Sequence, residues 1–299
     1  MKKKINRMPS VLAVSMALAM TVGAGLSIGA METNAAVTRN AARASAISMS
    51  YQASEKTEIG PGMTPWLTKE ITDSADELEQ ASNTITIKPE KFRLPEEAKL
   101  LVAVEGTGGS KCTVYVWEKA EDTWRLRLIT LGCLGENGMS NHRVSGDRTT
   151  PIGVFQLNTP FGQADPLEGF PADYVKVTET YVWEDETNRL AASSEKSGER
   201  VGTDAYARIY DYVLDAGYNK NAIEKKGSAL FLHCTEEGKK SSAGCVAIPK
   251  KSMIRIMRLY GTYGEGACYI AQAPRGTFDL VYDTYGANDG LSPEGDFGR

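Results

Sequence analysis

The chain has 299 residues, of which 41% are hydrophobic and 24% charged; this is the balance of a globular protein and excludes a disordered or fibrous one. Its net charge is −4 and it has no basic stripe, so nucleic acid is not expected as a partner. Its 29 glycines, 13 tyrosines and many Thr and Val residues favour a mainly β fold.

The first 36 residues have the pattern of an export signal. Three lysines and Arg7 precede an uncharged apolar run over residues 11–30, and small residues follow at 33–36. This pattern predicts a secretory signal peptide over residues 1–36. The run, about 20 residues, is also long enough to cross a bilayer, so an uncleaved membrane anchor is the alternative. Both alternatives predict an exported protein, outside the cell or in its wall.

Composition divides the rest of the chain into a domain and two flanking segments. Residues 37–97 are expected to form a linker or N-terminal extension, because Ala, Ser, Thr and Glu dominate there. A short helix fits near residues 69–81 of that segment. The folded domain is predicted over residues 98–275, which suits one domain in length. The Gly-rich, acidic end over residues 276–299 is expected to be a flexible tail.

Strand patterns begin with the apolar run Leu100–Val104. The segment Cys112–Trp117 is rich in β-branched and aromatic residues, and Trp124–Leu128 alternates apolar and basic residues. Such alternation marks a strand with one buried face. Residues 121–123 lie between these two segments and suit a hairpin turn. A further short strand is expected over residues 151–157.

Residues 158–228 are harder to assign, because nine aromatic residues are scattered among Gly, Pro and polar residues. One interpretation is a lid or the wall of a groove, and the other is packing over one end of a barrel. Both interpretations stay open on the sequence. The chain as a whole is predicted to be a β-barrel or sandwich with one or two short helices.

The last third of the chain gives clearer signals. An apolar strand over residues 228–232 leads into His233, and a polar loop then leads to Gly244 and Cys245. Pro249 suits the first turn of a helix, where its missing N–H is not needed. A last strand is expected over residues 268–273. The apolar face of the predicted helix, with i, i+3, i+4 and i+7 spacing, consists of Met253, Ile256, Met257 and Tyr260.

His233 and Cys245 form a candidate catalytic pair. A cysteine nucleophile needs a base to generate its thiolate, donors for an oxyanion, and an accessible position. Adjacent strands lie about 4.8 Å apart, so the loop between these two residues can bring both side chains to one rim. Gly244 lets the backbone approach a substrate closely. The N–H groups of Gly244 and Cys245 are the candidate oxyanion donors.

Two separated motifs occur in this part of the chain. The first motif is Gly-Asp-x-x-Thr-Pro-x-Gly-x-Phe, present as residues 146–155. The second is a strand histidine followed by Ser-x-Gly-Cys, present as His233 and residues 242–245. Together they resemble one known family, the L,D-transpeptidase catalytic domain (YkuD-like), in a branch common in Gram-positive bacteria. The resemblance covers about residues 98–273.

The resemblance implies a reaction on cell-wall peptide. Cys245 would attack the carbonyl between the third and fourth residues of a peptidoglycan stem tetrapeptide, with His233 as base and Ser242 as a supporting residue. The terminal D-Ala leaves, and the thioester reacts with an amine of a neighbouring stem to give a 3→3 cross-link. Acylation of the cysteine by carbapenems is expected. We predict a monomer that needs neither a metal nor an organic cofactor.

The sequence departs from the family pattern in three ways. Ala243 stands where many members have His, Ala247 stands where many have Arg or Asn, and the spacing from His233 to Cys245 is short. Binding of a substrate carboxylate must therefore come from other residues, and Arg148 and Lys250 are the candidates.

Two rival functions remain on the sequence. An L,D-carboxypeptidase or other hydrolase would use the same cysteine and histidine with water as acceptor. A wall-binding module with a decayed site would not need Cys245 at all, but the presence of both His233 and Cys245 argues against decay.

The remaining motif residues are interpreted as structural. His142 is expected on the surface, and Asp147 and Thr150 are expected to shape the turn before Phe155. Cys234 should point away from His233 on its strand and belong to the core. Cys112 and Cys133 form either a disulfide or two buried thiols.

Overall fold

A computed structural model describes residues 70–193, 195–236 and 238–285. The predicted signal peptide or anchor over residues 1–36 and the first part of the predicted linker lie outside these residues, as does the end of the predicted tail. Among the residues described, no helix is long and apolar enough to cross a membrane. The mainly β prediction is confirmed, with two α-helices in the described part of the chain.

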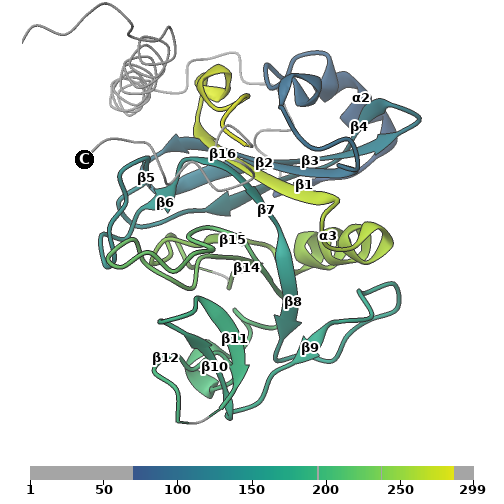
Figure 1. Ribbon diagram of the computed structural model, residues 1–299. Helices are drawn as coiled ribbons and strands as arrows, with labels where there is room; N and C mark the ends of the chain where they lie inside the picture. Colours follow the sequence, from purple (N-terminus) through teal and green to yellow (C-terminus); the bar gives the residue numbers. More distant parts are fainter. Residues whose placement is uncertain (1–69, 194, 237, 286–299) are drawn as a thin grey trace, which may run out of the picture.

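The centre of the molecule is a mixed sheet of 11 strands (Figure 1). Its order is β7-β16-β2-β3-β4-β15-β14-β13-β8-β9, and β1 pairs with β4 outside this path. The strands are β1 (Ile71–Thr72), β2 (Leu100–Gly108), β3 (Lys111–Ala120), β4 (Thr123–Cys133), β7 (Gly153–Gln156), β8 (Asn158–Gly162), β9 (Val175–Lys176), β13 (Val213–Asp215), β14 (Phe231–Cys234), β15 (Val246–Ile248) and β16 (Cys268–Pro274).

The predicted hairpin between the second and third strand segments is confirmed. Strand β3 ends at Ala120 and β4 begins at Thr123, so Glu121 and Asp122 form a two-residue turn with φ angles of 49° and 63°. Positive φ at both positions gives the turn a twist that matches the strands on either side. The apolar run Leu100–Val104 is fully buried, since elements cover both faces of the sheet.

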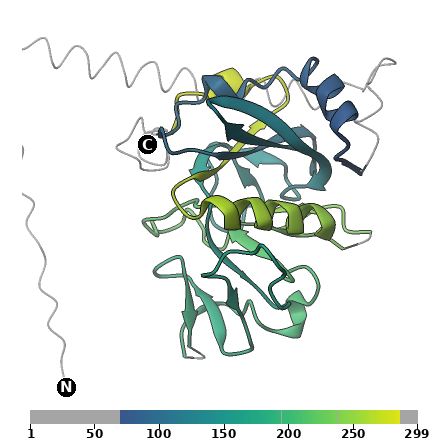
Figure 2. The same cartoon turned by 90° about the vertical axis from the view of Figure 1, so that its right-hand side faces the viewer.

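Helix α3 (Lys250–Tyr263) packs against one face of the sheet (Figure 1). Its predicted apolar stripe is confirmed, because Met253, Ile256, Met257 and Tyr260 are all fully buried. Pro249 is the N-cap and lies just before the first turn. Ser252 donates from its Oγ to Thr130 of β4 at 2.9 Å. Figure 2 shows α3 in the middle of the molecule, between the upper strands and the lower region that contains β8 to β12.

Parts of the predicted linker and tail pack onto the opposite face of the sheet. Residues 70–97 contribute β1, helix α2 (Ala75–Ser82) and the 3-10 turn η2 (Pro89–Lys91), and they bury Ile87 and Phe92. The Phe92 ring meets the Phe278 ring edge-on, with centroids 6.1 Å apart, and Phe278 lies in the 3-10 turn η4 (Phe278–Leu280). These segments therefore belong to the domain. Their apolar residues are too sparse to form a recognisable period, so composition alone suggested a linker.

The aromatic segment 158–228 supplies a second, smaller sheet in the order β11-β10-β12 (Figure 1). Trp183 on β10 is fully buried, and its ring packs edge-on against Phe231 of β14 at 4.8 Å. The segment also contributes β8, β9 and β13 to one end of the main sheet, and its residues Glu199, Tyr206 and Tyr210 line a pocket. The small strands not yet given are β5 (Met139–Ser140), β6 (Thr150–Pro151), β10 (Tyr181–Glu184), β11 (Arg189–Ala192) and β12 (Gly198–Glu199).

Candidate functional site

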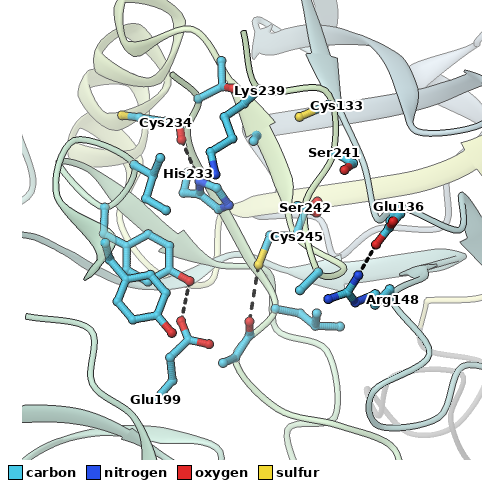
Figure 3. Close-up of a pocket in the computed structure, with 18 of the residues that line it drawn as sticks. Cys133, Glu136, Arg148, Glu199, His233, Cys234, Lys239, Ser241, Ser242 and Cys245 are labelled. Carbon is cyan, nitrogen blue, oxygen red and sulfur yellow. Dashed lines mark hydrogen bonds and ion pairs between the residues drawn. The ribbon is translucent and has the colours of Figure 1, made fainter. Parts of the chain in front are cut away.

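Parallel pairing of β14 with β15 brings the two candidate catalytic residues together. In this register His233 lies opposite Ala247, and Cys245 comes directly before β15. Both residues line one pocket of about 370 Å³ (Figure 3). The loop between them folds back so that Ser242 pairs with Gly135, which follows the end of β4. A short connection between two adjacent parallel strands therefore places a thiol and an imidazole in one pocket.

His233 is held in one tautomer. Its Nδ1 lies 2.7 Å from the carbonyl oxygen of Cys234, and because a carbonyl only accepts, Nδ1 carries the proton. Nε2 is then the nitrogen that can accept a proton. Burial lowers the pKa of His233 to about 4, so the ring is neutral at neutral pH. The edge of the ring packs against Tyr210, with centroids 5.2 Å apart. The histidine is therefore positioned and uncharged, as a general base must be.

Cys245 is a buried thiol that is only 7% exposed. Its Sγ lies 3.3 Å from the N–H of Phe231 and 3.4 Å from the carbonyl oxygen of Ala229. Burial raises the pKa of Cys245 to about 12; the Glu199 carboxylate adds to this rise, and Phe231 N–H and Arg143 oppose it. At neutral pH Cys245 is therefore a neutral thiol, and it would have to lose its proton to act as a nucleophile.

No hydrogen bond joins Cys245 Sγ to the His233 ring within the part of the chain that the structure describes. Ligand-free sites often show such loose catalytic geometry, which tightens when substrate binds. The two side chains nevertheless project into the same pocket (Figure 3).

Ser242 fixes the turn before Cys245. Its Oγ donates to the carbonyl oxygen of Cys245 at 2.6 Å and accepts from the N–H of Gly244 at 3.0 Å. This gives Ser242 a supporting position. It also engages the Gly244 N–H, which the sequence analysis had expected to be free for an oxyanion. Of the two predicted donors, the Cys245 N–H is thus the one that remains a candidate.

Gly244 is required at its position for two reasons. Its φ of +142° is unfavourable for any residue with a side chain. A Cβ built there would also lie 2.6 Å from Nη1 of Arg143 and 2.9 Å from the carbonyl oxygen of Thr149. The Gly-Cys motif therefore packs directly on the turn of the first motif.

The two predicted carboxylate-binding cations lie in different places. Arg148 lines the pocket and forms an exposed ion pair with Glu136. Lys250 does not line it, because its Nζ lies 2.5 Å from Asp211 and 5.2 Å from the centroid of the Tyr212 ring. Lys239 of the loop between His233 and Cys245 lines the pocket instead. The sequence offered one signal for Lys239, its position within that loop.

Arg143 is a buried cation beside the pocket that no sequence pattern indicated. It donates from Nη1 to the carbonyl oxygen of Thr149 and from Nε to that of Lys226 at 3.3 Å, and it lies 3.7 Å from Asp147. Asp147 in turn accepts from the N–H of Val144 at 2.7 Å, so its predicted structural role in the turn is confirmed. Arg143 joins three chain segments beside Gly244, and nothing in its local sequence indicates this.

Glu199 and Tyr210 come from the aromatic segment 158–228 and were also missed as individual residues. The Tyr210 hydroxyl donates to Oε1 of Glu199, and both residues line the pocket (Figure 3). Burial raises the pKa of Glu199, while the hydrogen bond from Tyr210 lowers it. The proposed groove wall in this segment was the only sequence signal for them.

The remaining predicted residues lie where the sequence placed them. His142 is exposed and Cys234 is buried. Cys112 and Cys133 are two buried free thiols, one of the two alternatives that the sequence left open. Among residues 70–285 that the structure describes, no group of three His, Cys, Asp or Glu side chains is arranged to hold a metal ion.

The model of the L,D-transpeptidase catalytic domain (YkuD) matches residues 109–262, a span that includes both motifs and every pocket residue discussed above. No curated protein matches the chain.

Proposed function

This chain belongs to the L,D-transpeptidase catalytic-domain family, and we propose that it forms 3→3 cross-links between peptidoglycan stem peptides through a thioester on Cys245. The observation that carries the proposal is the placement of a buried thiol and a neutral histidine in one pocket. Nε2 of that histidine is available as a proton acceptor, because Nδ1 is bonded to the Cys234 carbonyl.

Acylation would use this pair directly. The proton of Cys245 Sγ passes to His233 Nε2 as sulfur attacks the carbonyl between the third and fourth residues of the stem. The developing oxyanion is held by the Cys245 N–H, and His233 returns the proton to the leaving amine of D-Ala. Because both groups are neutral at rest, proton transfer and attack are coupled. In the second half, an amine of a neighbouring stem replaces sulfur at the carbonyl and releases the thiol.

The positively charged side chains at the rim of the pocket favour an anionic stem peptide as the acyl donor. Arg148 and Lys239 line it, and both side chains are exposed. Cations in these positions would bind carboxylates of the stem peptide, while the Cys245 end of the pocket holds the reacting carbonyl. The predicted export signal over residues 1–36 fits a substrate that lies in the cell wall, so we place the enzyme outside the cytoplasm.

The test is mass spectrometry of the intact protein incubated with a carbapenem. The wild type is expected to form a covalent adduct, Cys245→Ala none, and His233→Ala an adduct about 100-fold more slowly, since a general base contributes at least that much. A properly folded, reduced wild type that stays unmodified would rule out an active transpeptidase and favour a wall-binding module.

A tetrapeptide donor then identifies the acceptor. Product mass with an added amine distinguishes cross-linked product from the tripeptide that hydrolysis gives. Tripeptide alone, even at high amine concentration, would make the enzyme an L,D-carboxypeptidase.

A further inference from the structure

Two carboxylates line the catalytic pocket, and they differ in their partners. Glu136 is paired with Arg148. Glu199 receives a hydrogen bond from Tyr210, and no Lys or Arg forms an ion pair with it among the residues described. A partly buried carboxylate without a counterion, facing a reactive thiol, is unfavourable unless the bound substrate supplies the positive charge.

The position of Glu199 points toward the reacting atoms. Figure 3 shows its carboxylate with one oxygen on the tyrosine hydroxyl and the other facing the space below Cys245. The same Tyr210 ring packs against His233 at 5.2 Å. Glu199 and His233 are thus fixed on two sides of the pocket by one buried aromatic residue. The negative charge of Glu199 also acts on the thiol, because it contributes to the raised pKa of Cys245.

The chemistry of the second half-reaction needs a base of this kind. A side-chain amine of a diamino acid is an ammonium ion at neutral pH and has no lone pair with which to attack. It must lose one proton before the N–C bond forms and a second as the S–C bond breaks. The second proton passes to sulfur through His233. A water molecule loses only one proton in its attack, so hydrolysis does not need another base.

We propose that Glu199, held by Tyr210, forms the acceptor site of the pocket, where it binds the primary ammonium of the incoming stem peptide and removes its first proton. This inference rests on the proposed transpeptidase function. In the balanced step, the thioester and R–NH3+ give the amide and the Cys245 thiol. One proton ends on Sγ by way of His233, and the other leaves to solvent by way of Glu199.

The test compares two acceptors on the acyl-enzyme formed from a tetrapeptide donor. Nα-acetyl-lysine amide is a charged amine at pH 7, and hydroxylamine is a neutral one. Glu199→Gln keeps the shape of the side chain and an oxygen for Tyr210 but cannot take a proton. Transfer to the lysine amine should fall about 100-fold, while transfer to hydroxylamine stays within about threefold. Glu195→Gln, an exposed glutamate of the same segment, is the matched control.

The rate of D-Ala release measures the acylation step, and in Glu199→Gln it should change in the direction opposite to the rate of transfer to lysine. Without the Glu199 charge the thiolate of Cys245 is easier to form, so acylation should become faster as transfer to lysine becomes slower. A merely structural role of Glu199 would slow both steps and both acceptors together. Equal losses for lysine amide and hydroxylamine, or no loss for either, would overturn the proposal.

A measurement on the wild type covers the case in which Glu199→Gln fails to fold. Nα-acetyl-Nε-trimethyl-lysine amide carries the charge but cannot attack, and Nα-acetyl-norleucine amide is an uncharged chain of similar length. The trimethylated compound should compete with the lysine acceptor, and the norleucine compound should not. Equal inhibition by both would show that charge is not recognised.

The outcomes also separate this inference from the proposed function. Wild-type protein that releases no D-Ala and forms no acyl-enzyme would contradict the function itself. Wild-type protein that releases D-Ala but transfers only to water would overturn the acceptor site and leave the hydrolase alternative. Full transfer by Glu199→Gln would overturn the acceptor site alone.

Discussion

Thr150 donates a 2.8 Å hydrogen bond from its Oγ1 to the carbonyl oxygen of Gly244 and accepts one of 2.9 Å from the N–H of Gly135. This fully buried hydroxyl joins the Thr-Pro motif to the Gly-Cys motif, 94 positions further along the chain. The first motif therefore supports the backbone that carries the nucleophile.

Thr150→Val should destabilise the protein and slow acylation. Valine has the same shape but leaves the Gly135 N–H and the Gly244 carbonyl without a partner, which costs about 2 kcal/mol or more. Chemical denaturation measures the stability, and the rate of carbapenem adduct formation measures the site. Thr262→Val, an exposed hydroxyl bonded within α3, is the control and should cost less than about 0.5 kcal/mol. Equal effects of the two variants would refute the link between the motifs.

Gly244→Ala should abolish acylation. The new Cβ would meet Arg143 and the Thr149 carbonyl at less than 3.0 Å, in addition to the cost of a positive φ. Gly146→Ala separates these two effects, because Gly146 has a φ of +82° but open space around its Cβ position. The control should lose about 1 kcal/mol of stability and keep adduct formation. An active Gly244→Ala enzyme would show that the loop can move away from Arg143.

Acylation should persist to unusually low pH. His233 accepts a proton only when neutral, and burial lowers its pKa to about 4, so lowering the pH from 7 to 5 leaves the base intact. The adduct rate should then fall as the pH passes through about 4. An ordinary histidine would give a midpoint near 6.5. Rates measured across this range in wild type decide between the two, and a midpoint above 6 would mean that the ring is solvated in the working enzyme.

Asp215→Asn should stabilise the protein at high pH. Asp215 is buried on β13 with no partner for Oδ1, and burial raises its pKa from 3.8 to about 7. The folded state therefore binds the proton more tightly than the unfolded state, and this contribution is lost as pH rises through 7. The variant cannot ionise, so its advantage should be on the order of 4 kcal/mol at pH 8 and small at pH 4. Denaturation at both pH values measures it, and a difference independent of pH would contradict the assignment.

Arg148→Ala should raise the KM for a tetrapeptide donor about fivefold with a smaller effect on kcat, since Arg148 lines the pocket and a solvent-exposed cation contributes at most about 1 kcal/mol. Lys250→Ala is the matched control, because Lys250 is bonded to Asp211 outside the pocket. Steady-state release of D-Ala measures both. A larger effect for Lys250 would place the peptide on the other side of α3.

The local pattern of the sequence was sufficient for much of the fold and for the chemistry. Strand alternation, turn residues and a helical apolar stripe are properties of neighbouring residues, so the existence of the hairpin β3–β4 and of helix α3 was predicted, although β4 extends to Cys133, beyond the predicted strand. The pairing of His233 with Cys245 was also predictable, because only a short loop separates two strands that must lie side by side. The packing of residues 70–97 on the main sheet was not predictable, since isolated apolar residues such as Phe92 show no periodic pattern.

Contacts between distant segments were decided by the tertiary structure alone. The register of β14 on β15 and the fold of segment 158–228 bring Glu199 and Tyr210 to His233, and the turn at residues 143–149 brings Arg143 against Gly244. The sequence predicted that the Gly244 N–H donates to an oxyanion, yet in the folded loop this N–H donates to Oγ of Ser242. The sequence by itself identified the candidate reactive groups, because reactivity is a property of residue type. The tertiary structure decided the hydrogen-bond partners, charged neighbours and packing contacts of these groups, because such contacts depend on distances that no local pattern encodes.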